Sequence, residues 1–484
     1  MIIMTTTYSL KDWQQGYISQ KQEFSYWIDE IEGEIPPELT GTLFRNGPGL
    51  LDINGENIKH PFDGDGMICS FTFKNGQVYF QNKFVQTEEF KAEQKAGKIL
   101  YRGVFGTQKA GGWLANIFDL KLKNIANTNV IYWGGKLLAL WEAAEPYQLN
   151  PATLETIGLD YLNGTLKKGD SWSAHPWLDS SCKMDNDQPC LVNFSVKPGP
   201  KTTITIYELN PEGKVIREHS HYVPGFAFLH DMVITPDYCI FFQNPVSFKP
   251  LPYILGFVGA GQCLHYNPQA FTQIILIPRN GKDQVKILKT TPCFVFHHAN
   301  AFTEENKIIV DSVCYDSFPL VDPNTDFRDV KFNELPPGQL KRFTIDLETE
   351  KVTFQIIDER CCEFPSLHPD HVGRNYRFVY LGAAHFPTGN HPLQTVIKFD
   401  LKEGKNLIWS AFPRGFTGEP IFVPRPGGNT EDDGWVLILV YDAETNKSDL
   451  VILSAIDLQL VAKLHLKHHV PYGLHGNFTP ECFV

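Results

Sequence analysis

The sequence lacks the features that mark several broad classes of protein. Its ten cysteines include no Cys-x-x-Cys pair, so a cysteine zinc site is not expected, and reduced thiols are favoured over a disulfide framework. No apolar run reaches the ~18 residues of a membrane-spanning helix. The 43 basic and 55 acidic residues give a net charge of −12, which argues against nucleic acid as a partner. The first residues do not have the form of a signal peptide, so we expect a cytoplasmic protein.

Long helical patterns are also scarce, and short strand patterns dominate the sequence. Apolar runs are repeatedly divided by Gly, Asn, Asp and Pro, which is typical of an all-β fold. Hydrophobic residues make up 42% of the chain, enough for a large core, and β-rich architectures often reach this length as one unit. We therefore predict a single domain over residues 1–484, with an aromatic-rich N-terminal arm at residues 1–34.

A repeat emerges when the turn-forming residues are aligned. Each unit consists of a strand, a tight polar turn and a second strand. One Asn or Asp of each turn serves as a marker, and the seven markers are Asn75, Asn150, Asn210, Asn280, Asp346, Asp400 and Asp457. They lie 54–75 residues apart, a length that suits a propeller blade of four short strands better than a solenoid coil. The repeat predicts a seven-bladed β-propeller.

Histidine or glutamate recurs at a similar distance after six of the seven markers. At 17 to 25 residues beyond them lie His175, His230, His297, Glu363, Glu419 and His475. At that distance the chain is expected to return to an innermost strand, and innermost strands line the axis of a propeller. After the first marker a long insertion intervenes, and the corresponding strand is predicted to begin near Asn127. The six side chains should therefore meet on the central axis.

The four histidines favour a metal site. A buried imidazole needs a hydrogen bond or a metal, and four neutral imidazoles suit iron, copper, nickel or zinc. Glu363 and Glu419, together with Glu142, would accept the second ring protons of the histidines. Two alternatives stay open from the residues alone. Each histidine could be a hydrogen-bonded core residue, and the glutamates could pair with basic residues at the rim of the channel.

Several motifs resemble those of the carotenoid cleavage oxygenases, and the resemblance covers nearly the whole chain. The motifs are Arg45–Pro48, His60–Gly66, Phe228–Asp231, Phe296–Ala301 and Gly418–Arg425. The resemblance implies a seven-bladed β-propeller with non-haem Fe(II) on its axis and loops forming a dome over one face. By motif, the iron ligands would be His175, His230, His297 and His475, supported by Glu142, Glu363 and Glu419. The family uses the first histidine of the Phe-His-His segment, so His298 is not expected to bind the metal.

The resemblance also implies an activity. Members of the family cleave a polyene double bond with O2, and this chain is most similar to cyanobacterial members that cleave apocarotenoids at the 15,15′ bond to give retinal-type aldehydes. Thr128 stands where the family often has a threonine that crowds one open position of the iron. An apolar tunnel for the substrate could be lined by Phe62, Phe105, Trp141, Phe228 and Phe296. For each of these aromatic residues, core packing is an equal alternative.

Residues 244–261 form an apolar stretch that is broken by prolines and is too short to span a bilayer. We expect it to make peripheral contact with a membrane, and a loop buried against its neighbours is the alternative. Other functions stay open as well. The same iron site could act on stilbene-type or full-length carotenoid substrates or isomerise a retinoid ester without O2, or the propeller could only bind hydrophobic ligands.

Overall fold

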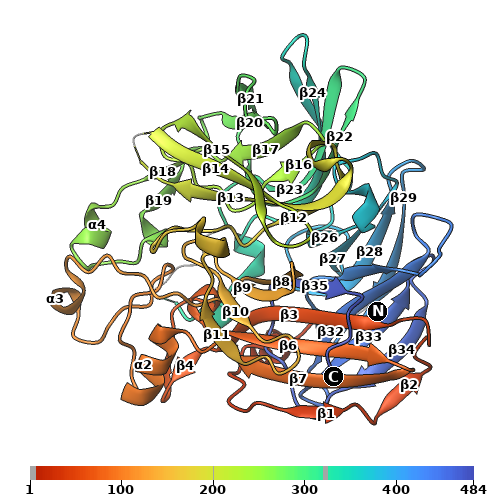
Figure 1. The fold of residues 1–484 in the computed structure, drawn as a ribbon. Coiled ribbons are helices and arrows are strands. Elements are labelled where there is room, and N and C mark those ends of the chain that lie inside the picture. The colour runs from red at the N-terminus through yellow and green to blue at the C-terminus, as the bar shows by residue number, and fades with distance from the viewer. Residues whose placement is uncertain (1–6, 200, 320–324) are drawn as a thin grey trace, which may run out of the picture.

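A computed structural model describes residues 7–199, 201–319 and 325–484, and the first six residues of the expected N-terminal arm lie outside these ranges. The described chain is built mainly from antiparallel strands. Seven sheets are arranged as the blades of a propeller (Figure 1). The all-β, seven-bladed architecture predicted from the sequence is confirmed.

The blades are numbered along the chain, and their strands are given from the axis outward. Blade 1 contains β35 (Gly476–Thr479), β3 (Gly41–Leu50), β6 (Asp65–Lys74), β7 (Gln77–Phe84) and β1 (Ser25–Trp27). Blade 2 contains β8 (Asn129–Trp133), β9 (Lys136–Leu140), β10 (Tyr147–Leu149) and β11 (Thr156–Leu159). Blade 3 contains β12 (Trp177–Cys182), β13 (Gln188–Lys197), β14 (Lys201–Leu209) and β15 (Val215–Pro224).

The remaining four blades follow the same plan. Blade 4 contains β16 (Val233–Ile234), β17 (Tyr238–Gln243), β20 (Thr272–Pro278) and β21 (Lys286–Thr290). Blade 5 contains β22 (Phe294–Glu304), β23 (Lys307–Tyr315), β24 (Gln339–Asp346) and β25 (Val352–Ile356). Blade 6 contains β26 (Cys362–Ser366), β27 (Phe378–Ala384), β28 (Leu393–Asp400) and β29 (Lys405–Ser410). Blade 7 contains β30 (Gly415–Thr417), β31 (Ile421–Pro424), β32 (Gly434–Asp442), β33 (Lys447–Ser454), β34 (Leu460–His465) and β2 (Ile31–Gly33).

The seven polar turns found in the sequence occupy one equivalent position in every blade. Each marker residue lies at the connection between the third and fourth strands counted from the axis, where β30 and β31 of blade 7 share the innermost position because both pair with β32. In the β6–β7 hairpin, Asn75 and Gly76 adopt left-handed backbone with φ of 54° and 71°. A two-residue hairpin turn requires this conformation at both positions, and Asn-Gly meets the requirement with little strain. The repeat in the sequence therefore reports the outer hairpin of each blade.

The two ends of the chain close the ring of blades. β35, near the C-terminus, pairs with β3 as the innermost strand of blade 1. β2, near the N-terminus, pairs with β34 as the outermost strand of blade 7. The N-terminal arm also contributes β1 to the edge of blade 1 and contains helix α1 (Leu10–Gln15). Opening the ring would therefore require breaking strand pairs at both ends of the chain.

The apolar core lies between neighbouring blades. Each of the seven pairs of neighbouring blades shares one cluster of buried side chains. Between blades 7 and 1, for example, Trp435 of β32 belongs to the same cluster as Phe73 of β6. The sheets bury their apolar faces against each other. Polar side chains at the ends of the innermost strands can therefore lie on the axis.

Loops and short helices gather at one side of the propeller. Helices α2 (Glu88–Ala96), α3 (Trp113–Asn116) and α4 (Leu251–Ile254) lie at the left in Figure 1, with the small hairpins formed by β4 (Asp52–Ile53) and β5 (Glu56–Asn57) and by β18 (Val246–Phe248) and β19 (Leu264–Tyr266). Short 3-10 turns occur at Pro61–Asp63, Leu162–Gly164, Lys183–Asp185, Gly261–Cys263, Phe327–Asp329, Phe332–Glu334 and Pro369–His371. Within the described ranges, no helix is long and apolar enough to cross a membrane.

Candidate metal centre and aromatic cavity

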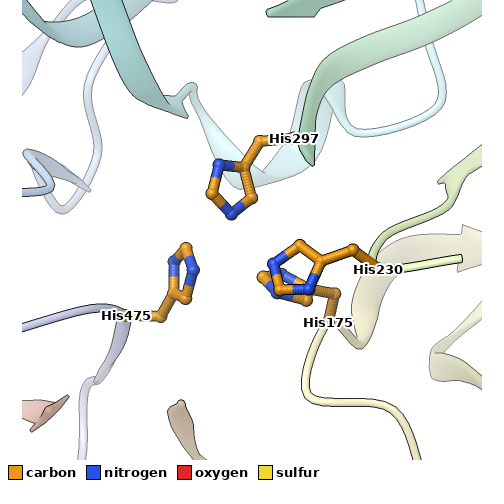
Figure 2. Close-up of side chains that lie close together, drawn as sticks. All are labelled: His175, His230, His297 and His475. Carbon is orange, nitrogen blue, oxygen red and sulfur yellow. The ribbon is translucent and has the colours of Figure 1, made fainter. Parts of the chain in front are cut away.

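Four histidines meet where innermost strands from four blades begin. His175, His230 and His475 lie shortly before β12, β16 and β35, and His297 lies within β22. The nitrogen atoms with which they could bind a metal all lie within 4.8 Å of one another. Figure 2 shows the four rings around a common point, each reaching it from a separate segment of the chain. The structure therefore brings together the four histidines that the sequence analysis selected.

The nitrogen atoms that face this point fit a metal ion. Nε2 of His297 is buried and has no hydrogen-bond partner among the described residues. Nε2 of His175 and Nε2 of His230 are 3.0 Å apart. Burial and the neighbouring histidines lower the pKa of His175 well below its ordinary value, so its ring is neutral and keeps a lone pair. Four imidazole donors around one point suit a first-row transition metal.

Three glutamates hold three of the rings from behind. The Nδ1 atoms of His230, His297 and His475 lie 3.1, 2.5 and 2.8 Å from carboxylate oxygens of Glu142, Glu363 and Glu419, respectively. When Nδ1 donates its proton to a carboxylate, Nε2 is left with a lone pair. Such a partner fixes the tautomer and the orientation of a ligating histidine. The three glutamates therefore lie where carboxylates that orient metal-binding histidines are expected.

Two of the glutamates are themselves held by polar partners that the sequence analysis did not assign. The hydroxyl of Tyr315 donates to Oε1 of Glu363 at 2.6 Å. Arg45 forms a buried ion pair with Glu419, so pairing with a basic residue occurs here in addition to the histidine contact. Burial opposes ionisation of all three carboxyl groups, but their contacts with the histidines outweigh it and lower their pKa values. The carboxylates are therefore charged acceptors.

His298 does not belong to the cluster. Its Nδ1 lies 2.7 Å from the hydroxyl of Ser312, and its ring packs against Phe242 with 5.0 Å between ring centres. The pairing of β22 with β23 shifts register between Val295 and His298 and again between His298 and Asn300, so the two adjacent rings are placed individually and not by regular strand alternation. Of the two adjacent histidines, His297 is the one that lies with the other three.

A cavity of about 370 Å³ borders the histidine cluster. Its wall includes all five aromatic residues proposed from the sequence as tunnel residues, which are Phe62, Phe105, Trp141, Phe228 and Phe296. The same wall contains His230, His297 and His475, together with Glu142 and Glu363. The ring centre of Phe296 lies 5.5 Å from that of His230, so the aromatic lining extends to the cluster itself. We call this space the aromatic cavity.

Thr128 lies at the border between the aromatic cavity and the histidine cluster. It is 5% exposed and belongs to the wall of the cavity. Its carbonyl oxygen accepts a hydrogen bond from the backbone N–H of His475 at 3.2 Å. Its hydroxyl donates to Oδ1 of Asn127 at 3.1 Å and lies 3.4 Å from Oε2 of Glu142. Thr128 is therefore tied to the histidine cluster through both its backbone and its side chain.

One wall of the aromatic cavity was not anticipated from the sequence. Trp13 and Tyr17 of the N-terminal arm line it together with Phe332 and Tyr472. Ring centres are 5.0 Å apart for Trp13 and Phe332 and 4.7 Å apart for Tyr17 and Tyr472. The arm was recognisable as aromatic, but no local pattern shows that it reaches the cavity, because these contacts join distant parts of the chain.

The stretch 244–261 is only partly exposed. Leu251 and Phe257 are 63% and 56% exposed, whereas Val246 and Tyr253 are buried. The rest of its apolar side chains are half-buried. The alternative of a loop buried against its neighbours therefore holds for Val246 and Tyr253, whereas Leu251 and Phe257 lie at the surface, where the expected membrane contact stays a prediction.

A second apolar segment, which the sequence analysis overlooked, lies beside α4. The backbone N–H of Phe118 donates to the carbonyl of Ile254 at 2.8 Å, and the rings of Trp113 and Phe257 are 5.7 Å apart. Together the two segments expose the side chains of Trp113, Leu114, Phe118, Leu120, Leu251 and Phe257, which we call the apolar patch. The signal was present in the sequence, because residues 113–118 are mostly apolar and follow two glycines.

Comparison with known proteins finds relatives that match nearly the whole chain. The family described as retinal pigment epithelial membrane protein matches residues 17–480. The chain is 55% identical to the apocarotenoid-15,15′-oxygenase of Synechocystis sp. over 476 residues, which cover 98% of this chain and 97% of the relative. An isoeugenol monooxygenase of Pseudomonas nitroreducens is 30% identical and is aligned over 93% of this chain and 94% of its own length.

Solved structures give the same result. The crystal structure of cobalt-substituted Synechocystis apocarotenoid oxygenase matches with a TM-score of 0.97 at 55% identity, and the match covers 98% of this chain and 100% of that one. The predicted resemblance is thus confirmed by sequence and by fold over nearly the whole length. The chain belongs to the family described as retinal pigment epithelial membrane protein, that of the carotenoid cleavage oxygenases.

Proposed function

We propose that this protein is a non-haem Fe(II) dioxygenase that cleaves the 15,15′ double bond of apocarotenoids with O2 to give retinal-type aldehydes. The observation that carries the proposal is the aromatic cavity that ends at the histidine cluster. Apolar walls with a few convergent polar groups are typical of a site that binds an apolar ligand and acts on it at one point. The name of the Synechocystis relative supports the choice of an apocarotenoid as substrate.

We propose His175, His230, His297 and His475 as the iron ligands. Held by these four residues, Fe(II) would supply the activation of O2. The three glutamates keep the rings of their histidines in place by accepting the Nδ1 protons. Cleavage of the carbon–carbon double bond leaves two carbon atoms, and each takes one oxygen atom of O2 to become a carbonyl group. The reaction therefore needs no NAD(P)H or flavin.

The side chains of the aromatic cavity would orient the polyene and exclude water. Phe228 and Phe296 line the cavity together with His230, and the ring of Phe296 meets that of His230 edge to face, so apolar side chains border the reacting position. Phe62 is 37% exposed, which places it near an opening of the cavity. Thr128, which lies in the cavity wall beside Glu142, would narrow the space next to the histidine cluster and so limit how the substrate approaches.

We further propose that the apolar patch docks on a membrane surface from which the substrate enters. Polyenes dissolve in bilayers far better than in water. Each apolar side chain that enters the bilayer contributes roughly 25 cal/mol per Å² of buried area. The stretch 244–261, which carries Leu251 and Phe257, is joined to the wall of the aromatic cavity at its far end: the N–H of Gly261 donates to the carbonyl of Val104 at 2.7 Å, and the next residue, Phe105, lines the cavity. The net charge of −12 argues against reliance on anionic lipids.

Arg102 holds the two halves of the patch together. Its fully buried guanidinium donates to the carbonyls of Asn116 and Asp119 at 3.2 and 2.7 Å. It also donates to the carbonyls of Tyr253 and Val258 at 3.0 and 2.6 Å. Because one side chain fixes the backbone of both segments, the exposed apolar side chains form one prebuilt surface.

Liposome co-sedimentation tests the docking surface. Replacing Leu114, Leu251 and Phe257 together with Ser should lower binding to phosphatidylcholine vesicles and turnover of substrate supplied in them. Turnover of detergent-dispersed substrate should persist, because the histidine cluster is untouched. The matched control replaces three exposed apolar residues elsewhere, Ile157, Phe271 and Leu407, which are 63%, 58% and 45% exposed. Equal binding by the parent and the patch variant, or equal loss in the control, contradicts docking through the patch.

A substrate panel tests the reaction. Iron-loaded protein is incubated with apocarotenals, a full-length carotenoid, a stilbene and a retinyl ester, with and without O2, and the products are identified by mass. We expect a retinal-type aldehyde and the complementary carbonyl fragment from apocarotenals, only with O2 and without added reductant. Full turnover under strict anaerobiosis contradicts the oxygenase and favours an isomerase. Cleavage of the stilbene alone contradicts the substrate assignment, and purified protein without stoichiometric iron favours a binding protein.

A further inference from the structure

A fourth buried carboxylate, Asp231, lies beside the metal centre. It follows His230 directly and is 6% exposed. It contributes to the wall of a second, smaller cavity of about 170 Å³, which also includes His175, His297 and His475. Asp231 is not part of the wall of the aromatic cavity. It therefore adjoins the metal centre without adjoining the proposed substrate.

The carboxylate of Asp231 joins three segments that each carry one histidine of the cluster. Oδ1 accepts hydrogen bonds from the indole Nε1 of Trp177 at 3.2 Å and from the N–H of Met232 at 2.7 Å. Oδ2 accepts the backbone N–H of His298, the residue after His297, at 2.9 Å. The three segments begin the innermost strands of blades 3, 4 and 5. One side chain thus connects three neighbouring blades at the axis.

His175 is the histidine that depends most on such a connection. The other three rings each bond a glutamate through Nδ1, whereas no described residue forms a hydrogen bond with Nδ1 of His175. Its segment is held through neighbouring groups, including the side chain of Asn129, which donates to the carbonyl of Ala174 at 2.7 Å. Only Pro176 lies between His175 and Trp177, and the fixed φ of proline stiffens this link. Because this link is short and stiff, fixing the indole of Trp177 also restricts where His175 can lie.

We propose that Asp231 is a positioning residue of the metal centre. Its carboxylate sets the separation of the segments that carry His175, His230 and His297. Through Trp177 it gives His175 the support that a glutamate gives each of the other three rings. This inference rests on the metal site of the proposed function. It assigns Asp231 to the metal and not to the polyene.

Asparagine has nearly the shape of aspartate but cannot replace it at this position. All of the groups that approach the two oxygens of Asp231 are N–H donors, so both oxygens must accept. An amide would turn its NH2 group toward an N–H on one side and bury two opposed donors. Flipping the amide only changes which side loses its acceptor. Asp231→Asn therefore breaks the connection while keeping the volume of the side chain.

Cobalt binding separates positioning from general stability. Co(II) is titrated into metal-free parent, Asp231→Asn and Trp177→Phe in competition with a chelator, and the visible d–d bands report the geometry of the donors. We expect about 10–100-fold weaker binding and altered bands for Asp231→Asn. Trp177→Phe removes one donor and keeps a ring, so it should change both readouts in the same direction by less. Asp311→Asn is the matched control, because Asp311 is fully buried and bonds Arg342 and Tyr376 away from the cluster.

The outcomes are distinguishable. If Asp231→Asn keeps the cobalt affinity and the spectrum of the parent, the inference is overturned. If Asp231→Asn does not fold, Trp177→Phe decides, and an unchanged spectrum in that variant overturns the inference. An equal spectral change in Asp311→Asn overturns it as well, because it would reflect a general loss of stability. A parent that binds no cobalt overturns the metal centre itself, and that failure is visible before any variant is made.

Discussion

Two buried polar clusters of this propeller meet the same geometric test for a metal site. One is the histidine cluster on the axis. The other lies at the boundary of blades 3 and 4, where atoms of Asp179, Cys182 and Cys190 lie within 4.8 Å of one another. We call it the thiol cluster, and all three of its residues are buried. Short distances between potential ligand atoms, and their burial, therefore do not by themselves show which cluster binds a metal.

What distinguishes them is whether a cation is already present. In the thiol cluster, fully buried Arg279 donates to Asp179 at 2.7 Å and to Glu208 at 2.8 Å. The same guanidinium lies 3.3 and 3.4 Å from the sulfur atoms of Cys182 and Cys190. In the histidine cluster, by contrast, Nε2 of His297 has no partner among the described residues. A group of donors indicates a metal site only where no side-chain cation occupies its centre.

The largest effect should follow removal of one histidine. His475→Ala leaves three of four donors, and we expect no iron to remain after desalting, measured by elemental analysis. His298→Ala is the matched control, because it removes an equally buried imidazole that bonds Ser312 outside the cluster. Iron should stay stoichiometric in that control. Iron that persists in folded His475→Ala would contradict the assignment of the metal to the histidine cluster, because another site, such as the thiol cluster, would then hold it.

The thiol cluster should respond in stability and not in metal content. Arg279→Met leaves the carboxylates of Asp179 and Glu208 buried with less compensating charge. Breaking a buried ion pair in this way typically costs about 3–5 kcal/mol. We expect this loss in the free energy of unfolding measured with urea, with unchanged iron per folded molecule. Wild-type stability would show that Arg279 does not stabilise the thiol cluster. A loss of iron from folded Arg279→Met would show that this cluster affects metal binding.

Much of the fold could be predicted from the sequence because its repeat is local. Hairpin turns need particular residues, such as Asn75 and Gly76, and they recur once per blade. The offset from turn to innermost strand then placed the four histidines together. Contacts between segments that lie far apart in the sequence, such as those that complete the wall of the aromatic cavity, were harder to predict. The N-terminal Trp13 and Tyr17 reach the aromatic cavity through contacts that no local pattern encodes.

The sequence also left the partners of the histidines incomplete. The motif match selected the three glutamates, and spacing alone selected two of them. Tyr315 and Arg45, which hold Glu363 and Glu419, have no periodic signal, because they occupy their positions only after the blades have packed. The same holds for Arg279. The feature that separates the two clusters, a guanidinium from the next blade, depends entirely on tertiary structure.

A supporting glutamate should matter less than a ligand. Glu363→Gln keeps an acceptor for Nδ1 of His297 but loses the charge that favours this hydrogen bond. Such changes typically cost about 10–100-fold in metal affinity. We expect weaker iron retention in competition with a chelator, with iron still bound at saturation. Complete loss of iron, equal to that of His475→Ala, would show that ligand and support have been assigned to the wrong residues.

The smallest effect should follow Cys190→Ala in the thiol cluster. The sulfur of Cys190 lies 3.4 Å from the guanidinium of Arg279, whose bonds to Asp179 and Glu208 do not depend on it. The net contribution of one hydrogen bond is about 0.5–1.5 kcal/mol, and a thiol is a weak acceptor. We expect a loss near the lower end of that range in urea unfolding, and an unchanged iron content. If Cys190→Ala instead released a bound metal, the thiol would be a ligand, and the presence of Arg279 would no longer exclude a metal from a cluster of this kind.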